Sequence, residues 1–152
     1  MKDIILNITK SKNDNNDWIY ENYKTNDINT KICDYRSQLL PVRNQLKQGT
    51  CYAQSVACIK EWQENKDYGL NEYLSPQFFY NHRNYWNNNK LEGNDLNEDY
   101  GMEARDVMKI LKDVGICKES EYPYGLIEKI NDIPIDIKNN ARKHCIKNYV
   151  KI

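Results

Sequence analysis

The feature that most constrains this chain is the loop at residues 45–50, which runs directly into a helical pattern that begins at Cys51. From Cys51 onward, apolar and polar residues recur at helical spacing, which predicts a helix to about Asp67 with one buried and one solvent-facing side. Thr50 stands where a side-chain oxygen can cap this helix. Cys51 is therefore placed at a helix N-terminus, where unpaired N–H groups and the helix dipole favour a thiolate.

Gln45 precedes Cys51 by six residues, with Gly49 between them. If the loop folds back on itself, the Gln45 amide would lie beside the thiol. That amide and the Cys51 backbone N–H would then supply two donors for the oxyanion that forms when a thiolate attacks a carbonyl. The alternative is that Cys51 is a buried structural cysteine that follows a turn.

The nucleophile region as a whole resembles that of the papain-like cysteine peptidases, which reads Gln-Gly-x-Cys-Gly-Ser-Cys-Trp-Ala. Residues 45–53 read Gln-Leu-Lys-Gln-Gly-Thr-Cys-Tyr-Ala. The approach is also similar, with Asp34-x-Arg36 and Pro41-Val42-x-x-Gln45. The resemblance implies a thiol peptidase in which Cys51 is the nucleophile and Gln45 an oxyanion donor, and it favours this role over the structural one.

Two later segments strengthen the resemblance. Residues 74–80 read Leu-Ser-Pro-Gln-Phe-Phe-Tyr, which predicts a second helix with Ser75 as its N-cap and Pro76 at its first position. A third helix is expected over about residues 102–114, ended by glycine. Residues 115–124 then match the family's Gly-Ile-x-x-Glu-x-x-Tyr-Pro-Tyr turn, which packs beneath the substrate cleft.

The junction at residues 99–102 falls where papain-like enzymes carry a Gly-Gly pair. By that resemblance, Gly101 pairs with the substrate backbone and Met102 lines the main specificity pocket. Tyr100 occupies the place of the first glycine.

The fold class implied by these matches is α+β: a papain-like fold, mainly its helical left domain with the start of the β-rich right domain. We expect an N-terminal arm at residues 1–33 and the helical domain at residues 34–140. At residues 141–152 a short helical piece should lead into the first strand of the truncated second domain, with Ile146, Val150 and Ile152 on one side.

The catalytic histidine and asparagine of the family lie about 130–150 residues after the nucleophile, which is beyond residue 152. Of the two histidines present, His82 is expected at the surface or capping a helix end. His144 is expected to be an exposed residue at a strand start rather than the base. The sequence thus predicts a peptidase that is incomplete in this chain, through truncation or because a second chain supplies the His/Asn half. The alternative is a non-catalytic module, derived from such a peptidase, that binds peptides or proteins.

Charge and hydropathy exclude several other roles. The 22 basic and 22 acidic residues cancel, so nothing indicates nucleic acid or an anionic membrane as a partner. The sequence shows neither a signal peptide nor a membrane span. The expected partner is a peptide or protein substrate.

The five cysteines indicate neither a metal site nor a disulfide framework. They lack metal-type spacing, and no cofactor is predicted. Where the family forms a disulfide beside the nucleophile, this chain has Gln48 and Glu98, which favours a reducing, cytoplasmic location. Cys58, two helical turns after Cys51, is expected to be a packed core thiol.

Overall fold

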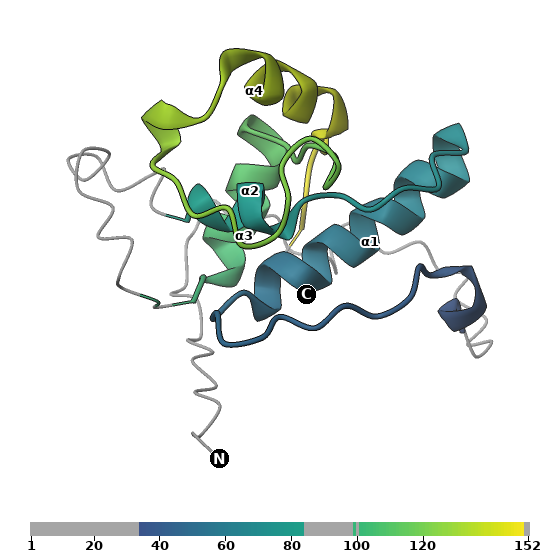
Figure 1. The fold of residues 1–152 in the computed structure, drawn as a ribbon. Helices are drawn as coiled ribbons and strands as arrows, with labels where there is room; N and C mark the ends of the chain where they lie inside the picture. The colour runs from purple at the N-terminus through teal and green to yellow at the C-terminus, as the bar shows by residue number, and fades with distance from the viewer. Residues whose placement is uncertain (1–33, 84–98, 100, 151–152) are drawn as a thin grey trace.

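The computed structural model describes residues 34–83, 99 and 101–150 (Figure 1). The predicted N-terminal arm at residues 1–33 lies outside the described residues, as do Glu98 and Tyr100. Helices α1, α2, α3 and α4 dominate the described part. None of its helices is long and apolar enough to cross a membrane.

Helix α1 (Cys51–Tyr68) begins at the residue that the sequence predicts. Its end is set by Gly69, which adopts a left-handed φ of 72° and donates its N–H to the Asn65 carbonyl. Ala53 and Ala57 are among the residues on its buried face, and the helix packs against both α2 and α3. The predicted extent of this helix is confirmed to within one residue.

Residues 34–50 run back along α1 in the opposite direction, as the dark blue segment of Figure 1 shows. This segment includes the 3₁₀ helix η2 (Arg36–Gln38). It is held to α1 by a hydrogen bond from Trp62 Nε1 to Gln38 Oε1 of 2.9 Å and by an ion pair of 2.8 Å between Arg43 and Glu61. The chain therefore approaches Cys51 along the helix that Cys51 begins.

Helix α2 (Pro76–Asn81) confirms the predicted cap. The Ser75 Oγ accepts the Phe78 N–H at 3.0 Å, and Pro76 takes the first helical position. All six residues of the helix are buried, so α2 forms the centre of the core.

Helix α3 (Ala104–Asp113) is followed by Gly115, which has a φ of 80°. A side chain at Gly115 would also collide with helix α4 (Ile135–Ala141), because its Cβ would lie 2.0 Å from the Ala141 carbonyl oxygen. The predicted glycine stop is confirmed, and the close packing of α4 gives a second reason for it. The core comprises these residues from all four helices and the segments between them: Ala53, Val56, Ala57, Leu74, Phe78, Phe79, Tyr80, Met102, Val107, Ile110, Leu111, Val114, Ile116, Cys117, Tyr122, Ile133 and Ala141.

The C-terminal segment differs from the predicted strand. The short helical piece is present, as the end of α4 and the 3₁₀ helix η4 (Arg142–His144). Residues 145–150 form no strand, although the Ile146 N–H donates to the Leu111 carbonyl at 3.2 Å. A strand requires a ladder partner, and no neighbouring strand is present in the described residues. The start of a β-rich domain is therefore not seen.

Candidate active site

The nucleophile loop, residues 45–50, folds back on itself at the start of α1. The Gln48 N–H donates to the Gln45 carbonyl at 3.3 Å, and the Gln45 side-chain amide donates to the Gln48 carbonyl at 3.0 Å. Leu46 takes a positive φ of 55° in this turn. Cys51 follows as the first, half-buried residue of α1. The Gln45 amide is thus held across the loop by the Gln48 carbonyl.

Thr50 does not cap α1, so that prediction is wrong. Its side chain makes no hydrogen bond to the helix N-terminus, and its Oγ1 lies 2.8 Å from the Tyr124 Oη. The Tyr124 hydroxyl donates to the Gln45 carbonyl at 2.7 Å. Because a carbonyl can only accept, Thr50 must be the donor to Tyr124. No acidic residue occupies the first turn of α1 either, so its N–H groups are left for an incoming anion.

The predicted substrate-pairing glycine lies in the same cluster as the loop. The Gly49 N–H donates to Asp99 Oδ2 at 2.6 Å, and the hydroxyl of Tyr80 donates to the other oxygen of Asp99. The Gly101 N–H in turn reaches the Tyr80 hydroxyl at 3.3 Å, with Gly101 at a φ of 76°. Tyr80 and Asp99 therefore join Gly101 to the loop that precedes Cys51.

Met102 lies just beyond this cluster but packs into the hydrophobic core. It is 6% exposed. The predicted role of Met102 in a specificity pocket stays a prediction, with only a small part of its side chain open to solvent.

His144 lies far from Cys51. Its Nδ1 is 2.9 Å from Glu64 Oε2, and its side chain is 15% exposed. Glu64 is thirteen residues along α1 from Cys51, a rise of about 20 Å. The prediction of an exposed residue at a strand start is wrong, since His144 ends η4 as a half-buried partner of α1.

His82 is buried at the end of α2. Its Nδ1 donates to the Phe78 carbonyl at 2.8 Å, and its ring packs on the Phe78 ring with centroids 4.5 Å apart. Burial lowers the pKa of His82 to about 4, which keeps the ring neutral near pH 7. The predicted helix-end role is confirmed, whereas a surface position is wrong.

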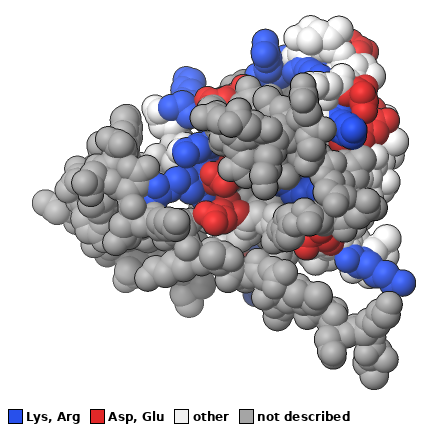
Figure 2. Space-filling view, turned by 90° about the vertical axis from the view of Figure 1, so that its left-hand side faces the viewer, with Lys and Arg blue, Asp and Glu red and all other residues white. Residues whose placement is uncertain are grey.

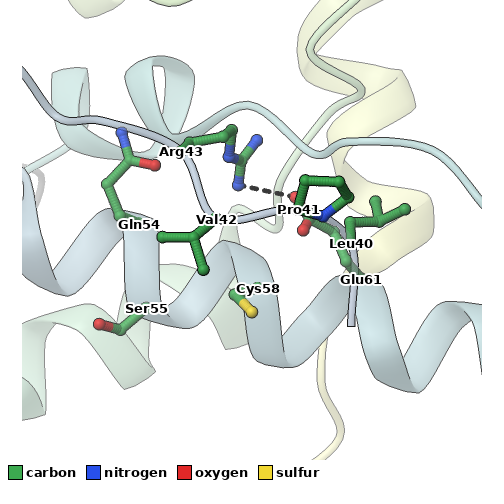
Figure 3. Close-up of a pocket in the computed structure, with 8 residues that line it drawn as sticks. All are labelled: Leu40, Pro41, Val42, Arg43, Gln54, Ser55, Cys58 and Glu61. Atoms are coloured by element: carbon green, nitrogen blue, oxygen red, sulfur yellow. Dashed lines mark hydrogen bonds and ion pairs between the residues drawn. The ribbon is translucent and has the colours of Figure 1, made fainter. Parts of the chain in front are cut away.

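A pocket of about 220 Å³ lies between α1 and the segment that runs back along it (Figure 3). Val42, Ser55 and Cys58 contribute to its wall, and Arg43 pairs with Glu61 beside it. Burial, followed by the nearby charge of Glu61, raises the pKa of the Cys58 thiol, which makes Cys58 a poor nucleophile. Cys58 is half-buried here rather than in the core, so the core prediction is wrong.

This pocket is separate from the nucleophile: its lining includes neither Cys51 nor Gly101. Figure 2 looks at the side of the molecule that is on the left in Figure 1. Where described residues are visible there, basic and acidic side chains are intermixed. No group of three potential metal ligands occurs among the described residues.

Comparison with solved structures decides the fold. Xylellain, a cysteine protease from Xylella fastidiosa, matches 95% of this chain with a TM-score of 0.66 and 20% sequence identity. The chain has a papain-like fold. It spans 57% of the xylellain chain. A structure from work on the mite allergens Blo t 1 and Der p 1 aligns over 83% of this chain and 37% of its own, with 18% identity and a TM-score of 0.49. No family model and no curated protein matches.

Sequence reasoning missed two residues of the candidate site. Tyr124 belongs to the turn motif at residues 115–124, but nothing in that motif indicates that its hydroxyl reaches the nucleophile loop. Asp99 begins the junction at residues 99–102, but no local pattern indicates its contact with Gly49, which spans 50 residues of sequence. The only available signal was Gly49 itself, since a glycine beside a nucleophile indicates the close approach of another group.

Proposed function

We propose that this chain is the nucleophile-bearing half of a papain-like cysteine peptidase. One observation carries the proposal: Cys51 begins α1 directly after a loop that holds the Gln45 amide and is joined through Asp99 to Gly101. The xylellain-like fold supports it. The loop that precedes Cys51 and the proposed substrate-pairing residue Gly101 thus belong to one hydrogen-bonded cluster.

In the proposed reaction, the Cys51 thiolate attacks a peptide carbonyl carbon and forms a carbon–sulfur bond. The carbonyl oxygen becomes an oxyanion, which accepts hydrogen bonds from the Cys51 N–H and the Gln45 amide. The Gly101 backbone holds the substrate chain. Collapse of the intermediate breaks the carbon–nitrogen bond, the amine leaves after gaining a proton, and water then releases the acyl group from sulfur.

Protonation of the leaving amine requires a general acid, and deprotonation of the attacking water requires a general base. His82 is buried on Phe78 and His144 is paired with Glu64, so we assign the transfers to neither. The base would come from a His/Asn half outside these 152 residues, on the same or a second polypeptide.

The deciding experiment supplies that half. We would coexpress this chain with candidate His/Asn-bearing polypeptides encoded downstream of it and measure hydrolysis of fluorogenic peptides. Activity that Cys51→Ala abolishes is the expected result. A stable complex that hydrolyses none of a broad peptide panel would contradict the proposal.

The second candidate is a non-catalytic module that binds peptides or proteins through the same cleft wall. Its motivation is that both histidines of the chain are engaged elsewhere. The module predicts equal binding of a captured peptide by wild type and by Cys51→Ala, with no hydrolysis by any reconstituted complex. Covalent capture that depends on Cys51 would exclude it.

A reducing, cytoplasmic location remains part of the proposal. Cys51, Cys58, Cys117 and Cys145 are free thiols, which supports it. Thiol titration of the protein purified from cytosol without reductant should count five thiols, matching the five cysteines. A native disulfide found by peptide mapping would contradict it.

A further inference from the structure

Tyr124 contacts both ends of the nucleophile loop through one hydroxyl group. It donates to the Gln45 carbonyl at 2.7 Å, at the start of the loop, and accepts from the Thr50 Oγ1 at 2.8 Å, at its end. These two residues flank the turn that precedes Cys51. Tyr124 itself comes from a separate part of the chain, 74 residues after Thr50.

The backbone of Thr50 does not have the angles of a capping residue. Residues whose side chains cap a helix normally have extended backbone angles, whereas Thr50 has a φ of −92° and a ψ of 18°. Thr50 is fully buried, so its hydroxyl requires a partner inside the protein. With Tyr124 present, that partner is a phenol oxygen. Without it, the nearest conventional solution is the cap, in which the Thr50 oxygen accepts an N–H of the first turn of α1.

We propose that Tyr124 is a positioning residue of the candidate site. It holds the Thr50 hydroxyl away from the first turn of α1, so that the N–H groups there stay available to the sulfur of Cys51, and it fixes Gln45 at the other end of the loop. The consequence for peptide hydrolysis rests on the proposed function. The consequence for Cys51 does not, because it is measurable in this chain alone.

The test is the rate at which iodoacetamide alkylates Cys51 at a fixed pH near 7, followed by peptide mass mapping. Tyr124→Phe keeps the ring and removes both hydrogen bonds. Thr50 is then expected to cap α1 and compete with the thiolate, slowing alkylation by about two- to fivefold. Tyr73→Phe is the matched control, because it also removes a bond from a tyrosine hydroxyl to a backbone carbonyl, that of Pro41 at 3.1 Å. It should alkylate at the wild-type rate.

A second substitution separates positioning from simple damage. In Thr50→Val/Tyr124→Phe the hydroxyl that would cap the helix is gone, so the alkylation rate should return to that of the wild type. A Tyr124→Phe rate equal to wild type would overturn the proposal. An equally slow double variant would also overturn it, since it would mean that the loop is merely disordered.

If circular dichroism shows that Tyr124→Phe does not fold, Thr50→Val decides alone. In the wild type the Thr50 hydroxyl does not contact the helix N–H groups, so Thr50→Val should alkylate no faster than wild type. A several-fold faster rate would show that the hydroxyl already caps the helix and would overturn the proposal. Should no second half ever confer peptidase activity while these rates hold, the proposed function fails and the positioning role of Tyr124 stands.

Discussion

The two ends of helix α1 handle polar groups in opposite ways. At the N-terminal end, the Thr50 hydroxyl bonds to Tyr124 instead of capping the helix, and no acidic residue lies in the first turn beside the half-buried Cys51. In the C-terminal half, charged side chains point inward and are paired. Glu64 contacts Lys60 at 2.5 Å and His144 at 2.9 Å.

Glu61 extends this paired region toward the segment that runs back along α1. It accepts from Arg43 at 2.8 Å and from the Leu74 N–H at 2.8 Å, while the same guanidinium reaches Glu119 at 2.6 Å. Buried charges of this kind are tolerated only when fully partnered. In the C-terminal half of α1 the polar side chains are paired within the fold and stabilise it. At the N-terminal end no side chain caps the backbone N–H groups, so they could bind an external group.

The largest effect should come from removing an ion-pair partner in the C-terminal half of α1. Glu64→Gln keeps the size of the side chain but leaves the Lys60 ammonium without its buried counter-ion. We expect the free energy of unfolding to fall by about 3–5 kcal/mol, measured by urea denaturation. Glu72→Gln is the control, since Glu72 pairs with Lys118 at an exposed site and should change stability by less than about 1 kcal/mol. Equal losses of unfolding free energy for Glu64→Gln and Glu72→Gln would mean that the buried ion pairs of α1 stabilise the fold no more than an exposed pair does.

Substitution of Gln45 tests the N-terminal end of α1, which has no side-chain cap. In a reconstituted peptidase, Gln45→Ala removes one oxyanion donor and should lower kcat by about 10²–10³ with a smaller change in KM. Gln38→Ala, in the same approach segment but bonded to Trp62, is the control and should leave kcat unchanged. A loss confined to KM would assign Gln45 to substrate binding instead.

Acid should weaken the protein through His82, which belongs to neither end of α1. Burial lowers its pKa to about 4, with Lys138 adding to the effect, so between about pH 6.5 and 4 the unfolded chain binds a proton that the folded chain does not. Its stabilising contribution is complete above about pH 6.5 and decreases by up to about 3 kcal/mol as the pH falls through that window. Urea denaturation at several pH values should show a flatter profile for His82→Gln. Parallel profiles would contradict this assignment.

Gly49→Ala should have the smallest effect. A Cβ at this position would lie 2.7 Å from Asp99 Oδ1, and the aspartate can rotate away at the cost of its bonds to the Gly49 N–H and Tyr80. Because Asp99 is exposed, water can replace these bonds, and we expect a loss of only about 1 kcal/mol in unfolding free energy. Asp99→Asn in the Gly49→Ala background should then cost little more, as a double-mutant cycle would measure. Full additivity would mean that the two residues do not interact.

Predictions from the sequence succeeded where the signal is local. The start of α1, the Ser75 cap and the Gly115 stop each depend on residues within one helical turn, and all three are confirmed. The prediction that Thr50 caps α1 is wrong because the Thr50 hydroxyl bonds to a tyrosine that is distant in sequence, and no local pattern indicates that contact. The positions of His82 and His144 were missed for the same reason, since their burial depends on how α1 and α2 pack.

The ties of the nucleophile loop also set when it can form during folding. The backbone hydrogen bonds of helix α1 join residues only four apart, but the loop before it is closed by partners 50, 74 and 79 residues away. Closing such long chain segments is entropically costly and must await docking of the intervening elements. A nascent or partly folded chain would therefore contain the helix but not an organised thiol site, so its chemistry would emerge only together with the tertiary structure.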